Sequence, residues 1–350
     1  MNPEKSNLKF PVMKKKHVVR NCEILSTASF FPDRSLSNQD IINKYDLPFK
    51  SNVIEKAIGV KSRFVAEGNM VDSDLLSLSA KKCLKKISLS PNKLSRIIVN
   101  KFLGDNILPM TASRLQKKLG CTTAVHSYDI DGGISSFLYS LDTALNYINT
   151  GDEFILISSG GINYRVMDKK DPRLVFLFGD GSASIIVGFS EKQHILASYF
   201  YTNYYYLDIA ISEGLLSLVS KIVDSNSDSI PNTYDTYRMD NWKKAEEFYR
   251  QAVKVTAENI LTESHLTMEN IDLVLVTENN CRIRELTLET LGVNEEKSIS
   301  MLKDHGNTMS AMLPMLIDKG YRTGEIQKGM NIMIISLGEG ISGGGLIYKV

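Results

Sequence analysis

The sequence predicts an α/β protein of two similar halves that stack in layers, in the order α-β-α-β-α. Three observations lead to this prediction. Strand-like and helix-like segments alternate along most of the chain, as they do in βαβ units with parallel strands. Two strand-like runs, Ile155–Ile157 and Ile332–Ile335, are wholly apolar, which is typical of strands covered on both faces. Segments of the first half also recur, in the same order, in the second half.

The internal repeat is visible at two places. Leu89–Asn100 is similar to Leu266–Thr277, and Gly151–Gly160 is similar to Gly329–Gly338. The two pairs of segments are separated by nearly the same length of chain. Chance similarity between apolar strands is the alternative explanation. The shared order and the nearly equal separations favour an internal duplication of about half the chain.

The elements of the first half follow from apolar spacing and from helix start and stop signals. The expected strands are Cys22–Phe31, Arg96–Val99 and Phe154–Ser158. The expected helices are Ser37–Tyr45, Ile54–Val60, Leu75–Ile87 and Pro109–Leu119. In the second half, Pro314 falls in the helix after Gly306 and should bend that helix or lie in its first turns.

Residues 189–245 break the repeat. Five tyrosines crowd the segment from Tyr199 to Tyr206, where a half-exposed strand, an aromatic pocket or a partner surface would each account for them. Ser225–Asp235 is rich in Ser, Asn and Asp, which indicates a flexible loop. The expected organisation is a flexible arm at residues 1–19, a first half at 20–188 and a second half at 189–350.

Composition is that of an ordinary globular protein. The chain has 350 residues, 43% of them hydrophobic, and a formal net charge of +1, so nothing favours a nucleic acid or an anionic membrane as a partner. No apolar run is long enough to span a bilayer and no secretory signal is present, so a cytoplasmic location is expected. No metal or other cofactor is predicted, because the four cysteines lack metal-binding spacing: Cys22, Cys83, Cys121 and Cys281.

The segment Tyr128–Phe137 is the centre of the functional question. A strand end is followed by Gly132 and Gly133 and then by an amphipathic helix, and such an elbow presents the first helical residue to a site. The residue at the tip is Ile134, whose side chain has no chemistry to offer.

Several motifs follow one another at informative spacing. They are Ile58–Arg63, the elbow, Phe178–Ser184, Arg282–Ile283, His305–Thr308, and the glycine-rich Gly338–Gly340 and Gly343–Gly345. Together they resemble the β-ketoacyl-ACP synthase III group of the thiolase superfamily, from about Cys22 to Val350. The resemblance implies a thiolase-like fold in which each half has a five-stranded mixed sheet, with the helices after Gly133 and Gly306 packed in the middle.

The same resemblance exposes two departures. Where the family carries its Cys nucleophile this chain has Ile134, and where the family carries its His it has Thr277. Asn280 and Asn307 remain at positions that the resemblance assigns to the active site, and Arg282, Gly338 and Gly340 at positions that it assigns to ligand binding. Acyl transfer from a thioester needs a thiolate or an activated hydroxyl, which isoleucine cannot supply.

Three residues are candidate substitutes for the lost groups. Ser135 is next to the tip but on a helix points about 100° away from it. Cys281 follows Asn280 in a loop, where a spectator thiol is the plainer interpretation. His305 adjoins the Gly306-Asn307 pair and would act as a base. A further histidine, His126, alternates within an apolar strand and is expected in the core.

Three functions from different classes remain open. The first is a catalytically degenerate synthase subunit, paired with an active synthase in fatty-acid, polyketide or related secondary-metabolite biosynthesis. The second is a condensing or acyltransfer enzyme with altered chemistry, using Asn280 and Asn307, with His305 as a further candidate. The third is an acyl-ligand-binding protein. Acyl-CoA and acyl-carrier protein are possible partners, although Glu285, Glu289, Glu295 and Glu296 surround the arginines of the helix expected to dock an acidic carrier.

The resemblance also implies a dimer, joined edge to edge through the strand at Ala124–Ile130. An unpaired apolar edge of this length would be prone to aggregation and should be covered. A heterodimer with an active synthase-like protein is favoured over a homodimer, because a homodimer would contain no nucleophile.

Overall fold

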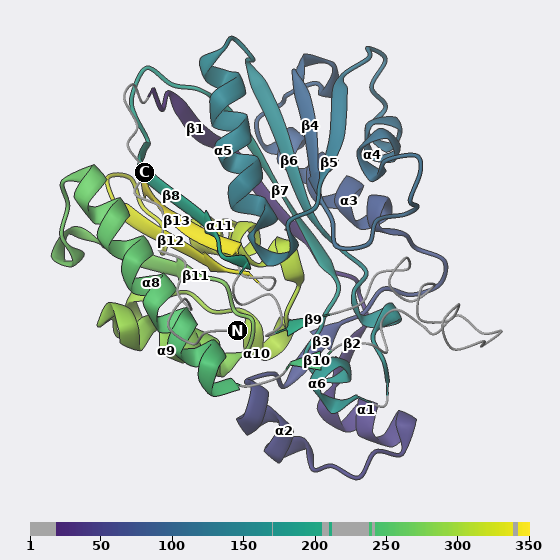
Figure 1. The fold of residues 1–350 in the computed structure, drawn as a ribbon. Coiled ribbons are helices and arrows are strands. Elements are labelled where there is room, and N and C mark those ends of the chain that lie inside the picture. The colour runs from purple at the N-terminus through teal and green to yellow at the C-terminus, as the bar shows by residue number, and fades with distance from the viewer. Residues whose placement is uncertain (1–18, 170, 205–209, 212–237, 240–241, 339–341) are drawn as a thin grey trace.

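The computed structural model describes residues 19–169, 171–204, 210–211, 238–239, 242–338 and 342–350. The expected arm at 1–19 and the loop at Ser225–Asp235 therefore lie outside the described residues, apart from Val19. Two large sheets and three helical layers alternate, so the layered α-β-α-β-α prediction is confirmed (Figure 1). Among the described helices, none combines the length and the apolar character that crossing a membrane requires.

The first sheet has five strands in the order β1-β7-β6-β4-β5. They are β1 (Cys22–Phe30), β4 (Arg96–Asn100), β5 (His126–Ile130), β6 (Phe154–Gly161) and β7 (Gly181–Phe189). The helices α3 (Asp72–Lys86) and α4 (Thr111–Leu119) cover its outer face, where Leu76, Leu84 and Leu115 join a core with the outward residues of β4 and β6. The helix that was expected at Pro109–Leu119 begins two residues later, at Thr111.

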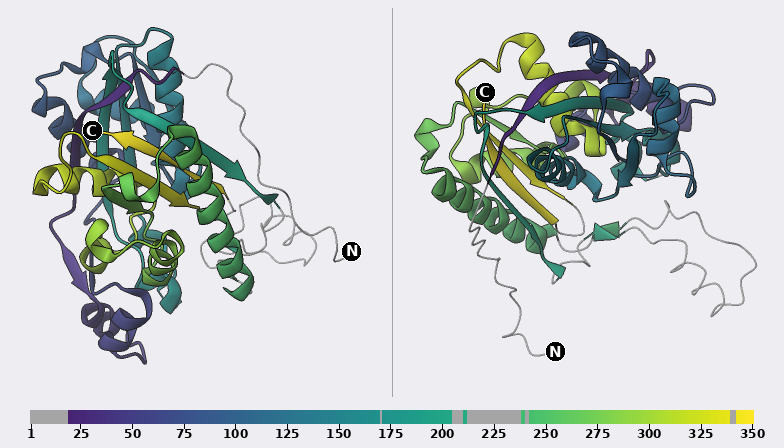
Figure 2. Two further views of the ribbon diagram at one scale, coloured as in Figure 1. Left: turned by 90° about the vertical axis from the view of Figure 1, so that its left-hand side faces the viewer. Right: turned by 90° about the horizontal axis from the view of Figure 1, so that it is seen from above.

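The second sheet has four strands among the described residues, in the order β11-β12-β13-β8. They are β8 (Ile195–Thr202), β11 (Leu273–Val276), β12 (Asn331–Leu337) and β13 (Ser342–Lys349). The helices α8 (Trp242–Ser264) and α9 (Cys281–Leu291) cover its outer face. The two further views in Figure 2 show α8 running along the outside of this sheet.

Five strands were predicted for this sheet, and the fifth is reduced to a single parallel bridge between Val274 and Ser298. The short helix η8 (Glu295–Lys297) occupies most of the segment that leads to that bridge. Too few residues remain there to form a ladder.

The pairing registers of the two sheets are the strongest sign of the duplication. Arg96 pairs with Ile155 in the first sheet, and Leu273 pairs with Ile332 in the second, so both members of the pair are displaced by the same length of chain. Each sheet also has one register shift between its first strand and the next, at Leu25 in β1 and at Leu196 in β8. A β-bulge repeated at the same place in both sheets is a feature of the fold rather than of one half. We therefore propose the boundary between the halves near residues 188 and 189.

The helices α5 (Ser136–Asn149) and α11 (Met312–Thr323) form the middle layer. Their leucines share one apolar cluster with residues of both sheets, including Ile98 and Leu275, which fixes the two halves against each other. Pro314 lies in the first turn of α11, where its missing N–H removes no helical hydrogen bond.

Shorter elements complete the chain. They are β2 (Ser35–Ser37), α1 (Asn38–Tyr45), α2 (Ser51–Ile58), β3 (Ser62–Phe64), η2 (Pro91–Lys93), η3 (Gly133–Ser135), η4 (Tyr164–Val166), α6 (Pro172–Val175), β9 (Ala210–Ile211), β10 (Arg238–Met239), η7 (Met268–Asn270), α10 (Leu302–His305) and η9 (Met309–Ala311).

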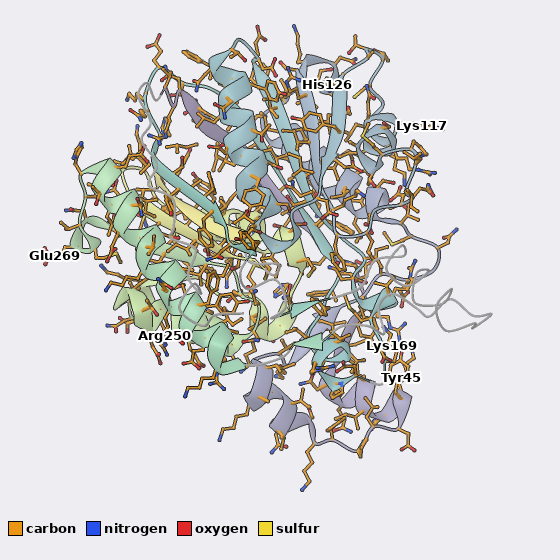
Figure 3. The ribbon with its side chains drawn as sticks, viewed as in Figure 1. Tyr45, Lys117, His126, Lys169, Arg250 and Glu269 are labelled. Carbon is orange, nitrogen blue, oxygen red and sulfur yellow. The ribbon has the colours of Figure 1, made fainter. Side chains whose placement is uncertain are left out.

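Two expectations about single side chains need correction. His126 is exposed rather than in the core, because β5 is the edge of the first sheet, and Figure 3 shows it at the outer end of that strand. Tyr199 and Tyr201 are buried under α8 and belong to the second core, whereas Tyr204 is exposed. Tyr205 and Tyr206 lie outside the described residues.

Candidate functional site

The elbow has the shape that its sequence predicts. β5 ends at Ile130, Gly133 takes a left-handed φ of 57°, and the single turn η3 leads into α5. Only 2% of the Ile134 side chain is exposed, and it packs with Phe178, Met309 and Met312. The position suited to a nucleophile is therefore occupied by an apolar side chain in an apolar cluster.

A corresponding turn from the second half meets the elbow. η9 precedes α11 as η3 precedes α5, and it opens with Met309 at a left-handed φ of 55°. A non-glycine residue in this region is strained, and such strain is held only where the surroundings enforce it. Here the Met309 N–H donates to Oδ1 of Asn307 at 2.7 Å, which holds the turn in place.

Asn307 is fully buried and fixed at both ends of its amide. Besides accepting from Met309, it donates from Nδ2 to the carbonyl oxygen of Asn279 at 3.2 Å. The neighbouring Asn279 donates in turn to the carbonyl oxygen of Leu337 at 3.1 Å. Asn279 was not among the expected site residues, although it lies between two that were.

Thr277 lies at the end of β11 and is 1% exposed. Its hydroxyl oxygen accepts a hydrogen bond from the Leu337 N–H at 3.0 Å. This bond closes the end of β11 onto β12, so Thr277 has a structural task in place of the imidazole that the resemblance puts there.

Ser135 is also fully buried, and its hydroxyl joins the two halves. Its Oγ lies 2.8 Å from Oγ of Ser336 and 3.3 Å from the carbonyl oxygen of Ser342. Gly338 is required beside it, because a Cβ at that residue would lie 2.7 Å from the Ser135 Oγ. Gly340 lies outside the described residues.

His305 lies at the end of α10 and is held between aromatic rings. Its ring centroid is 4.5 Å from that of Phe31 and 5.3 Å from that of Phe64, and its Nδ1 lies 3.0 Å from the Met301 carbonyl oxygen. Burial lowers the pKa of His305 below its ordinary value, so the ring is neutral near pH 7.

The residues at the start of α9 serve the helix rather than the elbow. Asn280 is its N-cap and accepts the Ile283 N–H at 3.0 Å, while the Cys281 Sγ contacts the Ala57 carbonyl oxygen of α2 at 3.7 Å. Burial raises the pKa of the Cys281 thiol, which disfavours the reactive thiolate. Arg282 forms an ion pair of 3.0 Å with Glu246 of α8.

The structure thus brings together Ile134, Ser135 and Asn307 at the junction of the halves. Thr277 is buried just beyond β11, where it bonds to Leu337, and Cys281 and Arg282 lie on the outer helical layer. Within the described part of the chain, no group of three His, Cys, Asp or Glu side chains is arranged to hold a metal ion.

Two buried charges near the junction were not predicted. Asp180 accepts the backbone N–H groups of Ala66, Asn163 and Tyr164, and burial raises its pKa to about 6. Arg63 is fully buried and donates to the carbonyl oxygens of Leu36 and Phe176, and burial lowers its pKa to about 10. Both residues belong to motifs of the sequence, but only the folded loops show that their role is to organise backbone.

Comparison with known proteins shows what the chain is similar to. The family model for 3-oxoacyl-[acyl-carrier-protein] synthase III matches residues 128–203, and the model for the C-terminal part of that family matches residues 261–350. The β-ketoacyl-[acyl-carrier-protein] synthase III of Neisseria gonorrhoeae is 29% identical over 330 residues, which cover 93% of this chain and 98% of the relative.

Solved structures share the fold. The 3-oxoacyl-(acyl carrier protein) synthase III of Pseudomonas aeruginosa superposes with a TM-score of 0.82 at 21% identity, covering 94% of this chain and 98% of that one. The priming β-ketosynthase of a polyketide biosynthetic pathway superposes with a TM-score of 0.83 at 23% identity, covering 96% and 99%.

The layered architecture and the two meeting turns define a protein of the thiolase-like fold. Within that class the chain is a β-ketoacyl-ACP synthase III-like protein, related over nearly its whole length to this group of condensing enzymes.

Proposed function

We propose that this chain is a catalytically silent β-ketoacyl-ACP synthase III-like subunit, the non-catalytic partner of an active synthase in fatty-acid, polyketide or related secondary-metabolite biosynthesis. The observation that carries the proposal is the apolar burial of Ile134 at the tip of the elbow. Without an acceptor atom there, no acyl-enzyme can form at the position that the fold presents.

The engagement of the candidate substitutes supports the same conclusion. The hydroxyls of Ser135 and Thr277 are bonded within the junction, and the amide of Asn307 is bonded at both its oxygen and its nitrogen. His305 contacts Phe31 and Phe64 rather than a nucleophile, and Cys281 contacts α2. None of these groups is paired with a base as an activated nucleophile would be.

The charges on α9 argue against tight docking of an acidic carrier protein. Arg282 pairs with Glu246 at 3.0 Å, and Arg250, which Figure 3 shows on α8, pairs with Glu246 and Glu289. Cations already paired with carboxylates attract an acidic partner only weakly. The carrier is therefore assigned to the active subunit of the pair.

The surface around β5 supports assembly. β5 is the edge strand of the first sheet and pairs only with β4 within the described part of the chain. Beside it, the loop before α4 exposes Ile107 by 89% and Leu108 by 81% of their surface. The Asp129 carboxylate of β5 accepts the Thr111 and Ala112 N–H groups, which ties this loop to the strand. An apolar loop next to an open edge is a surface that a partner subunit would cover.

Intact-mass measurement tests the silent site. The purified protein is incubated with acyl-CoA or with acyl-ACP, and we expect its mass to remain unchanged. A stoichiometric acyl adduct on Ser135 or Cys281 would refute silence and support the altered enzyme instead.

Co-purification tests the partner. Tagged protein isolated from its own cells should carry with it, in equal amounts, a related chain that has Cys and His at the positions of Ile134 and Thr277. Recovery of the protein with only copies of itself would refute the heterodimer.

A further inference from the structure

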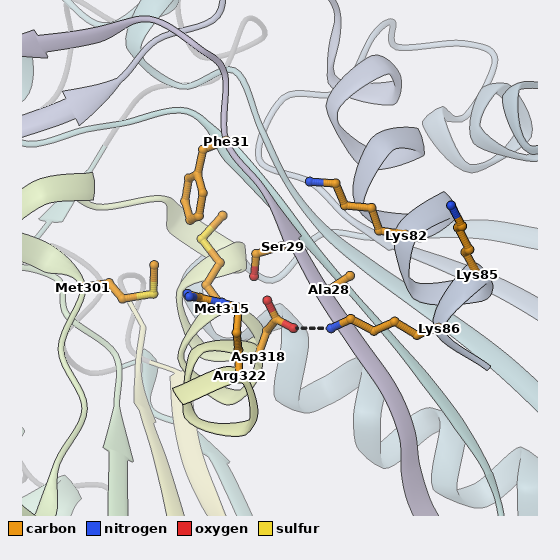
Figure 4. Close-up of a pocket in the computed structure, with 10 residues that line it drawn as sticks. All are labelled: Ala28, Ser29, Phe31, Lys82, Lys85, Lys86, Met301, Met315, Asp318 and Arg322. Carbon is orange, nitrogen blue, oxygen red and sulfur yellow. Dashed lines mark hydrogen bonds and ion pairs between the residues drawn. The ribbon is translucent and has the colours of Figure 1, made fainter. Parts of the chain in front are cut away.

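A cleft of about 610 Å³ opens beside β1. It lies between the last turns of α3, the edge strand β1 and α11, as Figure 4 shows. Volumes of this order are typical of sites that hold small organic molecules. The elbow residue Ile134 does not line it.

The floor of the cleft is apolar. It is formed by Ala28 of β1, Phe31 of the following loop, Met301, and Met315 of α11. Met315 is 2% exposed and Phe31 is fixed against the His305 ring, so the floor is built into the fold. Methionine and phenylalanine side chains adapt well to a hydrocarbon chain.

The rim of the cleft is basic. It carries four cations and one carboxylate, and the carboxylate is already in use: Asp318 pairs with Lys86 at 3.2 Å and accepts the Thr27 hydroxyl at 2.8 Å. Among the described residues, Lys82, Lys85 and Arg322 have no carboxylate within ion-pair distance. The four cations and one carboxylate leave the rim with a net charge of +3.

One polar group inside the cleft also lacks a partner. The Ser29 Oγ is buried and makes no hydrogen bond within the described part of the chain. A buried hydroxyl without a partner costs free energy that a bound acceptor would recover. The apolar floor, the basic rim and the unpaired hydroxyl together suit a ligand that has a hydrocarbon chain and an anionic head.

We propose that this cleft binds a medium-chain fatty carboxylate, with its hydrocarbon chain on Phe31, Met301 and Met315 and its anionic head between the Ser29 hydroxyl and Lys82. The ligand contacts α11 at Met315, one helical turn from Met312, which packs on Ile134. The site is separate from the elbow and does not depend on whether the elbow is silent.

Calorimetric titration with decanoate, below the concentration at which it forms micelles, tests the proposal. We expect saturable binding of one decanoate per chain. Decanol has the same chain without the charge and should bind at least about tenfold more weakly, because it lacks the interaction with the rim cations. Decanoyl-CoA distinguishes a free fatty acid from an acyl thioester as the source of the chain.

The variant Lys82→Glu/Arg322→Glu reverses two exposed rim charges and should weaken decanoate binding by about tenfold or more. The matched control, Lys81→Glu/Lys328→Glu, changes the net charge equally at exposed lysines that do not line the cleft, and should bind as the unchanged protein does. The proposal is overturned if decanoate shows no saturable binding, if decanol binds equally well, or if both double variants bind alike.

Discussion

At the tip of the elbow the backbone has the turn of an active elbow, but the side chain that it carries has no reactive group. Gly133 supplies the left-handed turn that exposes the next residue in an active elbow, yet Ile134 turns into an apolar cluster with Phe178 and Met309. The same turn also positions Ser135, whose hydroxyl meets Ser336 of the other half. The elbow is thus a structural joint between the halves, whatever its chemistry.

Restoring the nucleophile alone should not restore activity. In Ile134→Cys the thiol enters an apolar cluster, which raises its pKa, and Thr277 offers no imidazole to remove the proton. We expect at most weak acylation by acyl-CoA in intact-mass measurements, little condensation, and a stability loss of about 1 kcal/mol from the smaller side chain. Full acylation of the single variant, matching that of Ile134→Cys/Thr277→His, would contradict this account.

The pH dependence of stability should report on His305. Its folded pKa is lowered by burial, so the unfolded chain binds the proton more readily. The contribution of the neutral ring is therefore present above the ordinary His pKa and is lost as the pH falls through the lowered folded value. We expect the unfolding free energy to fall with acidification below about pH 6.5.

The variant His305→Phe keeps an aromatic ring against Phe31 and Phe64 but cannot be protonated. Denaturant unfolding at a series of pH values should show a shallower acid slope for this variant than for the unchanged protein. Parallel slopes would mean that His305 is protonated equally well in both states.

The sequence predicts the position of a residue where local turn and helix signals set its backbone, and does not predict contacts that depend on distant segments. Ile134 and Asn307 lie at the junction as expected, because turn and helix signals beside them set the backbone. The tasks of Thr277 and Asn279 were not predictable, because both bond to Leu337, which is distant in the sequence and adjacent only after β11 and β12 pair. The orientation of a side chain at a strand end is a tertiary property.

At the scale of elements, α9 and α10 are joined by one buried carboxylate. Glu278 accepts the N–H groups of Met301 and Leu302 at the start of α10, and lies 3.3 Å from the Arg284 guanidinium of α9. Both side chains are at most 7% exposed. Arg284 has a second partner in Glu295, which is largely exposed and therefore contributes less.

Removing one charge of this pair should be costly. We expect Glu278→Gln to lower the unfolding free energy by about 3 kcal/mol, because it leaves the Arg284 charge buried with only an exposed counter-ion. Glu296→Gln, an exposed neighbour, should change it by less than about 0.5 kcal/mol. Denaturant unfolding measures both, and a further Arg284→Met in the Glu278→Gln background should recover part of the loss.

Helices and strands could be predicted where an apolar pattern recurs in both halves, and could not be predicted where it does not. The strands β4, β6, β11 and β12 follow from apolar runs, and the common displacement between the two pairs survives in the pairing registers. The expected fifth strand of the second sheet did not follow, because a single bridge at Ser298 replaces a ladder. Local pattern cannot distinguish one paired residue from a full strand.

At the scale of the whole molecule, the edge of β5 that no described strand covers is the feature that still needs an explanation. The predicted interface at Ala124–Ile130 has Ala124 and His126 exposed, but Val125 and Ile130 pack against the chain's own cores. A charge at Val125 or Ile130 would therefore disturb folding as well as association. A decisive test needs an apolar residue that is largely exposed in the single chain.

Leu108 meets this condition, since it is 81% exposed in the loop that Asp129 ties to β5. We expect the unchanged protein, purified from its own cells with its partner, to sediment as a dimer at micromolar concentration, and Leu108→Asp to shift it toward monomer with no change in its circular dichroism spectrum. An obligate interface usually buries more than about 2,000 Å², so one charge near its centre weakens it by orders of magnitude. Val53→Asp, at a side chain 57% exposed on α2, is the matched control and should leave the dimer intact. If the unchanged protein is itself a stable monomer, with the β5 edge open to solvent, both the homodimer and the heterodimer form of this assembly are wrong. If the two aspartate variants dissociate equally, the dimer exists but its interface lies elsewhere.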